Sequence, residues 1–257
     1  MKKIFAIIFL LLVSFSFATP IQENDFLPSE NGTLPSNIDA RYDGGVDVIV
    51  TAYSNVSGVT ADAPNGDGYV LRLGDLGSGG GFYNWAAVKD MSKATTDSYA
   101  EAYVYLNLSV ATVERDYGLF VRCTSLAAQG TGSARNGYML LITANSLWSS
   151  YTAVNYTPFI LKRNGSTGWT LVAAGTSTVS DGWHKLKIQA IGTTISGFVD
   201  DVKVAEGTDS TFTSGVGGMV YYDDTDGVVA DTWPYAAAFD QFKYGTASPV
   251  NDWKEMK

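Results

Sequence analysis

The chain has 257 residues, with 26 acidic and 17 basic side chains and a formal net charge of -9. This acidic excess disfavours a nucleic-acid partner, because binding to phosphates requires clustered Lys and Arg. Cys123 is the single cysteine, which excludes an intramolecular disulfide, so stability must come from the core or from a bound metal. Because Cys123 alternates with Val121 and Leu119, we expect a buried structural thiol rather than a nucleophile.

The first eighteen residues have the pattern of a secretory signal peptide. Lys2 and Lys3 precede an apolar run over 4–13, and 16–18 reads Ser-Phe-Ala, a small-x-small cleavage site. The apolar run has about half the length that a membrane-spanning helix needs. We therefore expect cleavage after Ala18, no membrane span in the mature chain, and a secreted or cell-surface protein, with the periplasm as an alternative location. A short polar leader, residues 19–24, is expected to follow.

From Asp25 onward the chain consists of short segments rich in Val, Ile, Tyr and Phe that alternate with period two. Turn signals rich in Gly, Asn and Asp separate them, and no long segment has a helical period. The predicted strands are 46–53, 69–73, 99–108, 117–124, 137–143, 159–162, 170–173, 183–190, 194–199, 202–205, 216–222 and 236–244. This pattern predicts an all-β fold, a two-sheet antiparallel β-sandwich (jelly roll) over 25–245, with a polar tail over 246–257.

The segment 183–205 predicts a three-strand meander. Leu186, Ile188 and Ala190 share one face of the first strand and alternate with polar residues, which is typical of a half-buried strand. The turn at Gly192 leads to the second strand, and Asp200-Asp201 forms a tight turn into the third.

Four motifs in this order resemble the concanavalin A-like lectin/glucanase superfamily, and in particular its laminin-G-like jelly rolls. They are Trp183-His184-Lys185-Leu186-Lys187-Ile188, the segment 192–204, Gly215-Val216-Gly217-Gly218 and Phe239-Asp240-Gln241-Phe242. The opening segments 24–26 and 31–36 are similar to the first strand and loop of that family. Two departures are Asp201, where the turn usually has Gly, and Ile38, where Trp is common.

No catalytic residue is assigned from the sequence. Glucanases of this superfamily carry the pattern E-x-D-x-x-E, which the chain lacks. Glu101 alternates with tyrosines on one predicted strand, where a polar residue on a solvated sheet face is the simpler interpretation. His184 is the only histidine, so any Ser-His-Asp triad would have to include it. The resemblance favours a structural role for it.

The resemblance implies a structural calcium ion held between the first and last strands. Carried over to this chain, it makes Asp240 the main candidate metal ligand, with Asp25 and the Asn31-Gly32 loop as partners. A second acidic group, Asp223, Asp224, Asp226 and Asp231, resembles part of a calcium loop but is more simply a solvated hairpin loop.

Exposed aromatic side chains are the candidates for carbohydrate contacts, because sugar rings pack their apolar faces on Trp and Tyr. The candidates in loop-like contexts are Trp148, Tyr151, Trp233, Tyr235, Tyr83 and Trp85.

These observations favour a secreted, non-catalytic carbohydrate-binding or adhesive jelly roll, stabilised by calcium, whose partner is a glycan or polysaccharide. One alternative is a glycan-active hydrolase or lyase of the same fold. Another is a structural surface protein that binds protein partners.

Overall fold

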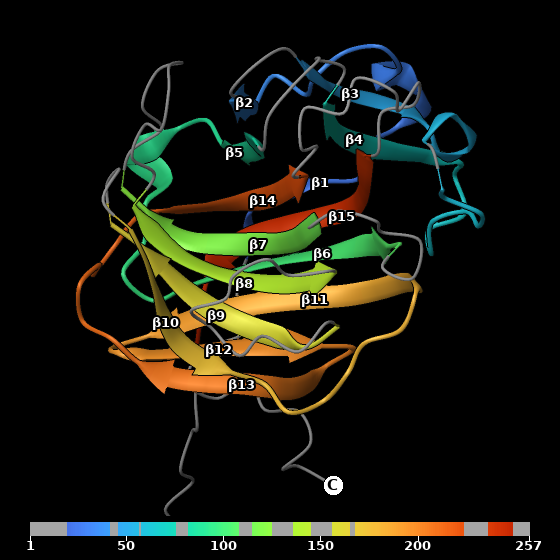
Figure 1. Cartoon of the computed structure of the whole chain (residues 1–257). Helices are drawn as coiled ribbons and strands as arrows, with labels where there is room; N and C mark the ends of the chain where they lie inside the picture. The colour runs from blue at the N-terminus through green and yellow to red at the C-terminus, as the bar shows by residue number, and fades with distance from the viewer. Residues whose placement is uncertain are drawn as a thin grey trace, which may run out of the picture.

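The computed structural model describes residues 20–41, 46–56, 58–75, 82–107, 115–124, 136–144, 156–164, 168–223 and 236–248. Within these ranges the chain forms fifteen strands and three short 3-10 helices, Pro28–Glu30, Tyr53–Asn55 and Met91–Lys93. The strands make two antiparallel sheets, drawn as stacked layers in Figure 1. The predicted two-sheet β-sandwich is confirmed.

Sheet A has the order β13-β12-β11-β6-β15-β4-β3, with β1 pairing with β15 as well. Its strands are β1 (Pro20–Asn24), β3 (Val46–Ala52), β4 (Tyr69–Asp75), β6 (Ser98–Leu106), β11 (Gly182–Ile191), β12 (Thr194–Val199), β13 (Val202–Thr208) and β15 (Ala236–Thr246). The predicted meander is β11-β12-β13. Asp200 and Asp201 both have positive φ, 50° and 65°, as a two-residue hairpin turn of this kind requires.

Sheet B has the order β10-β9-β8-β7-β14-β5-β2. Its strands are β2 (Ile38–Arg41), β5 (Phe82–Val88), β7 (Arg115–Cys123), β8 (Gly137–Ala144), β9 (Pro158–Arg163), β10 (Trp169–Ala174) and β14 (Val216–Asp223). All nine residues of β7 are buried, so both faces of this central strand are covered. Cys123 is 1% exposed, which confirms the predicted buried thiol.

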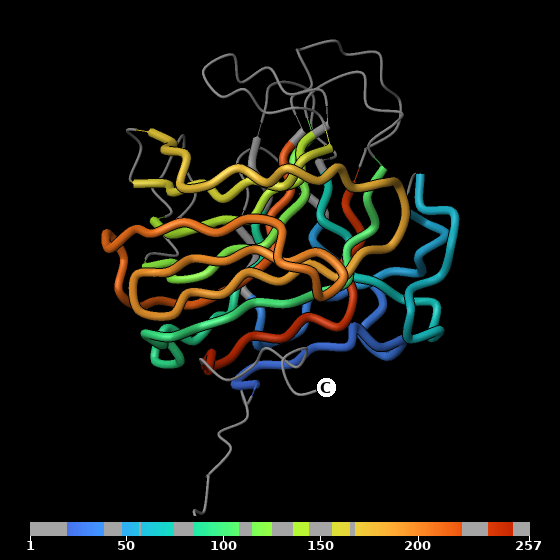
Figure 2. Tube along the Cα trace, turned by 90° about the horizontal axis from the view of Figure 1, so that it is seen from below, coloured from blue at the N-terminus to red at the C-terminus, as the bar shows by residue number. Residues whose placement is uncertain are grey.

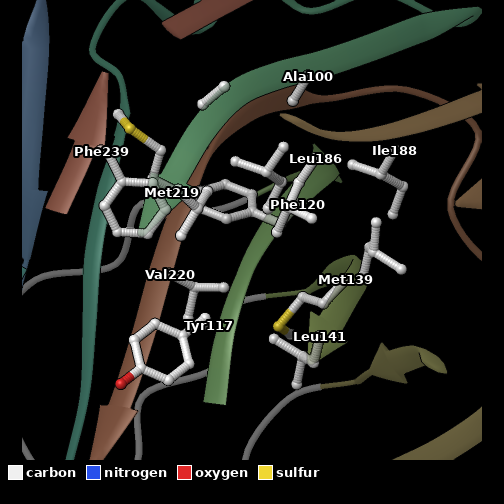
Figure 3. Close-up of a cluster of buried hydrophobic side chains, with 14 of the residues drawn as sticks. Ala100, Tyr117, Phe120, Met139, Leu141, Leu186, Ile188, Met219, Val220 and Phe239 are labelled. Carbon is white, nitrogen blue, oxygen red and sulfur yellow. The ribbon is translucent and has the colours of Figure 1, made fainter. Parts of the chain in front are cut away.

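The core lies between the sheets, where apolar side chains from both layers form one cluster (Figure 3). The sheets approach closely at Gly217 of β14. A Cβ atom there would lie 2.6 Å from Tyr244 of β15 and 3.2 Å from Ala100 of β6, both in sheet A. The Gly-rich motif of the sequence therefore has a packing reason at this position.

The first described strand corrects the predicted leader. Residues 20–24 form β1, which pairs with the C-terminal half of β15, and Figure 2 shows the blue and red strands side by side. At the other end, β15 continues to Thr246, and Ala247 and Ser248 are buried. The folded domain therefore extends beyond the predicted 25–245 at both ends.

The connection between β3 and β4 folds onto the outer face of sheet A, the face opposite the core. Loop and sheet form a small second apolar cluster: Val56, Ala63, Val70, Tyr105, Ala236 and Ala238. The indole N–H of Trp183 donates a hydrogen bond to the carbonyl of Ala61 at 3.0 Å and ties the loop to β11. In the described ranges, no helix is long and apolar enough to cross a membrane.

The hydroxyl of Tyr244 links strand β15 to the segments that precede β6 and β14. This buried hydroxyl donates to the carbonyl of Gly215 at 2.7 Å and accepts from the N–H of Thr95 at 3.2 Å. We expect Tyr244→Phe to lower the free energy of unfolding by about 0.5–1.5 kcal/mol, because it removes buried hydrogen bonds while Thr95 and Gly215 still pair with each other through their backbones. Urea denaturation measures this. Tyr103→Phe, on the outer face of sheet A, is the matched control and is expected to change stability by less than about 0.5 kcal/mol.

Candidate functional site

Three acidic side chains from distant parts of the chain come near one another at the outer face of sheet A. Asp25 follows β1, Asp67 lies in the loop before β4, and Asp240 lies in β15. The charges of Asp25 and Asp67 both act on Asp240. Asn65 joins the group, because its side-chain amide donates to Asp25 Oδ1 at 3.5 Å.

A β-bulge in β15 shapes the position of Asp240. The register of β15 against β6 shifts between Asp240 and Lys243, and Gln241 has a φ of 50°. Bulges of this kind re-aim side chains next to binding sites. Asp240 pairs across the strands with Tyr103, whose side chain is on the outer face, so the carboxylate lies under the β3–β4 loop rather than in the main core.

The Asp240 carboxylate is buried without a compensating positive charge among its described contacts. The residue is 0% exposed, and its Oδ1 accepts the N–H of Gln241 at 2.8 Å. Its Oδ2 has no hydrogen-bond partner. Burial raises the pKa of Asp240 to about 7, a rise that the Gln241 hydrogen bond opposes and the Asp25 and Asp67 charges reinforce.

Asp67 also has one carboxylate oxygen without a hydrogen-bond partner. Its Oδ1 accepts the N–H of Tyr69 at 2.8 Å, whereas its Oδ2 is buried and has no hydrogen-bond partner. Two unpartnered carboxylate oxygens beside a third carboxylate are the donor chemistry that Ca²⁺ prefers. Among the described residues, however, no three His, Cys, Asp or Glu side chains already converge as a metal site. A cation here would have to draw the carboxylates together.

The Asn31-Gly32 loop, predicted as a further partner, does not join this group through any described contact. Asn31 makes a parallel bridge with Val50, and Gly32 donates its N–H to the Val50 carbonyl at 2.8 Å. Of the second acidic group, only Asp223 lies within the described residues, at the end of β14, and the others lie outside them.

Glu101 belongs to a ladder of alternating charges across sheet A. It lies opposite Lys187 of β11 on one side and Lys243 of β15 on the other. Lys243 in turn forms an ion pair with Glu23 of β1 at 3.0 Å. Opposite charges at cross-strand positions stabilise a sheet face. The structure therefore gives Glu101 a place in a structural ladder, in line with the simpler interpretation of the sequence.

Trp85 is not a surface platform, which corrects the prediction. It lies in β5, is 4% exposed and packs edge-on against Phe120 with ring centroids 5.1 Å apart. The backbone of Tyr83 is in the same strand. Trp148, Tyr151, Trp233 and Tyr235 lie outside the described residues. Trp169, at the start of β10, is partly exposed and carries the Arg163 guanidinium 4.8 Å from its ring centroid.

Sequence reasoning missed Asp67 as a member of the acidic group. Asn65-Gly66-Asp67-Gly68 reads as a turn, and the structure confirms that Asn65 accepts the N–H of Asp67, as turn residues do. Only the folding of this loop onto sheet A brings it near Asp240, and nothing local in the sequence specifies that contact.

Comparison with known proteins supports the fold alone. No family model and no curated protein matches the chain. A Bacillus subtilis protein of unknown function with a galectin-like fold is 13% identical to this chain, with 90% of this chain and 98% of that protein covered and a TM-score of 0.53. The potassium-bound carbohydrate recognition domain of Emp46p is 11% identical, with 88% and 100% covered and a TM-score of 0.54.

The exoplasmic/lumenal domain of VIP36 in its Ca²⁺/Man-bound form is 9% identical, with 90% and 92% covered and a TM-score of 0.53. These neighbours share the two-sheet β-sandwich fold of this chain, while the concanavalin A-like and laminin-G-like assignments stay predictions. At such low identity the likeness assigns no ligand or residue role to this chain.

The buried carboxylate has a consequence for pH. Because the pKa of Asp240 is higher in the folded state (about 7) than its ordinary value of 3.8, the folded protein keeps a proton that the unfolded chain releases within this window. The stability contributed by the proton is therefore lost as pH rises. In chelator, we expect the free energy of unfolding of the wild type, relative to Asp240→Asn, to fall by roughly 2–3 kcal/mol between about pH 5 and about pH 8.

Urea denaturation at several pH values measures this difference. Asp201→Asn, whose side chain is 61% exposed, is the control and is expected to show no such pH-dependent difference from the wild type. A constant difference between the wild type and Asp240→Asn over this range would contradict the assignment.

Proposed function

We propose that this chain is an exported carbohydrate-binding or adhesive protein, non-catalytic towards its glycan, whose jelly roll is stabilised by calcium. The observation that carries the proposal is its two-sheet architecture, shared over most of the chain with the carbohydrate recognition domain of Emp46p and with the VIP36 domain in its Ca²⁺/Man-bound form. Export rests on the signal-peptide pattern of residues 1–18. The partner is a glycan or polysaccharide, not a nucleic acid.

Aromatic residues of the loop-like segments of the sequence form the proposed glycan contact. With Trp85 buried, the proposed stacking residues are Trp148, Tyr151, Trp233, Tyr235 and Tyr83. Trp and Tyr offer flat apolar surface together with a polar group, which suits sugar rings with apolar faces and hydroxyl edges. Trp148 and Trp233 lie in polar or Pro-interrupted segments, which favours an exposed position over a core position.

Calcium is the proposed cofactor, and Asp240, Asp25 and Asp67 would hold it. The support is the unpartnered Oδ2 atoms of Asp240 and Asp67, the burial of Asp240 and the nearby charge of Asp25. A divalent cation would compensate charge that is otherwise costly to bury. Its role would be structural, since it would join the segment after β1, the β3–β4 loop and the bulge of β15.

The glycan-binding proposal is tested with the mature chain on a glycan array and on insoluble polysaccharides, followed by calorimetry on the best ligand. We expect Trp148→Ala and Trp233→Ala each to weaken binding about tenfold or more, because the loss of an aromatic anchor costs at least about 1.4 kcal/mol. Tyr103→Ala, on the outer face of sheet A, is the control and is expected to leave affinity unchanged. Absence of binding to any glycan would contradict the proposal.

The calcium proposal is tested separately by thermal unfolding at about pH 7.5, with calcium or with chelator. An ion present at about 100 times its dissociation constant adds about 2.7 kcal/mol, or roughly 5–10 °C in Tm for a domain of this size. We expect this rise in the wild type and in Asp201→Asn, and none in Asp240→Asn. Equal Tm values of the wild type in both buffers would exclude a stabilising calcium ion and would leave the glycan proposal standing.

A further inference from the structure

The only histidine of the chain lies between a serine and an aspartate. His184 is near the start of β11, and its Nδ1 is 2.7 Å from Oδ2 of Asp200. On the other side of the ring, Nε2 is 3.4 Å from Oγ of Ser180. A nucleophile, a base and a group that orients the base therefore stand in a row, which is the arrangement that defines a Ser-His-Asp triad.

Asp200 is held in place by the fold and does not depend on the histidine for its position. Its N–H donates to the Lys185 carbonyl at 2.8 Å, and its Oδ1 accepts the Lys185 N–H at 2.9 Å. Its φ of 50° belongs to the tight turn between β12 and β13. These contacts leave Oδ2 directed to the ring of His184.

The ionised Asp200 carboxylate only accepts hydrogen bonds, so Nδ1 of the ring carries the proton. In the neutral imidazole, Nε2 then has a free lone pair on the side of Ser180, and the Ser180 hydroxyl can donate to it. Ser180 itself follows Val179, which is buried and donates its N–H to the Tyr156 carbonyl at 2.7 Å. The serine is therefore presented by an anchored segment rather than by a free loop.

We propose that Ser180, His184 and Asp200 form an open hydrolytic triad for short acyl esters. Oγ of Ser180 attacks the ester carbonyl carbon while its proton passes to Nε2 of His184. The bond from that carbon to the alcohol oxygen breaks, and His184 returns the proton to the departing alcohol. A water molecule then gives a proton to His184 while its oxygen bonds to the acyl carbon. The bond from that carbon to Oγ of Ser180 breaks, His184 returns the proton to Oγ, and the acid is released. Asp200 keeps the imidazole oriented and stabilises its positive charge.

The exposure of the site sets the substrate class and the rate. Ser180 is exposed, and the Asp200 side chain is 55% exposed, so an acyl group that projects from a larger molecule can reach the serine. Among the described contacts we assign no donor to the oxyanion, so water would stabilise it. Because a single preorganised oxyanion donor is worth roughly 10²–10³ in rate, we expect turnover far below that of an enclosed triad. The 3.4 Å separation is also longer than the usual range, as in many sites without bound substrate.

A purely structural role for the His184–Asp200 pair makes a different prediction. The pair would then simply connect β11 to the β12–β13 turn, and Ser180 would react like any exposed serine. Covalent labelling separates the two roles and does not depend on fast turnover. A fluorophosphonate probe transfers its phosphonyl group to an activated serine and releases fluoride, and peptide mass spectrometry locates the modified residue.

We expect the wild type to be labelled at Ser180, and Ser180→Ala to be unlabelled with an unchanged Tm. Ser177→Ala removes a neighbouring exposed serine and is the matched control, which should label as the wild type does. His184→Asn and Asp200→Asn should each slow labelling at least tenfold. In Asp200→Asn the Oδ1 contact with Lys185 can be kept while the wrong ring tautomer is favoured. The rate of p-nitrophenyl acetate hydrolysis should fall in Ser180→Ala, His184→Asn and Asp200→Asn and stay unchanged in Ser177→Ala.

The proposal is overturned if the folded wild type is not labelled at Ser180. It is also overturned if folded Asp200→Asn and His184→Asn label as fast as the wild type, because the serine would then react without the other two groups. Both outcomes are independent of glycan or calcium binding, which involve other residues.

Discussion

A buried carboxylate in the middle of β15 is the constraint on which one half of this sandwich depends. β15 pairs with β6, with β4 and with the N-terminal strand β1, so it joins the two ends of the domain. At the bulge in this strand, Asp240 is fully buried with one oxygen unpartnered. Burying such a group is costly unless it is protonated or paired with a cation. The balance between these two states links the stability of the domain to pH and to metal.

The contact between the two sheets is held by apolar packing. Gly217 allows the sheets to approach closely at Tyr244, and both faces of β7 are covered. The outer face of sheet A is different, because it carries the charge ladder of Glu23, Lys243, Glu101 and Lys187. A ladder of alternating charges is suited to contact with water. The cross-strand pairing of Glu101 with Lys187 and Lys243 accounts for this carboxylate without a catalytic role. The outer face of sheet A therefore gives no support to the alternative of a glycan-active enzyme.

The sequence was sufficient for the sandwich and the meander because those strands bury one face. In β11, for example, Leu186, Ile188 and Ala190 are buried and the residues between them are not, so period two is visible. The three strands that it missed lack this pattern. β5 is buried at four consecutive positions, 85–88, which hides the alternation and made Trp85 look like a loop residue. β1 is polar and begins with proline, and β2 has only four residues.

The candidate site was predictable only in part. Asp240 and Asp25 follow from the resemblance of the first and last strands to a known family. Asp67 does not, because its approach to Asp240 depends on how the β3–β4 loop packs on sheet A. Likewise, the sequence identified His184 as the residue that any triad must use, but the positions of Ser180 and Asp200 on its two nitrogens required the fold.

The most direct test of the central claim is a carboxyl-carbon NMR titration of Asp240 in the mature protein, with and without calcium. In chelator, the account predicts a pKa of about 7 for Asp240, because the carboxyl is buried near two like charges. With saturating calcium, the apparent pKa should fall by at least about two units, because the ion binds only the ionised form. A pKa near the ordinary value of 3.8 in chelator, unchanged by calcium, would contradict the account.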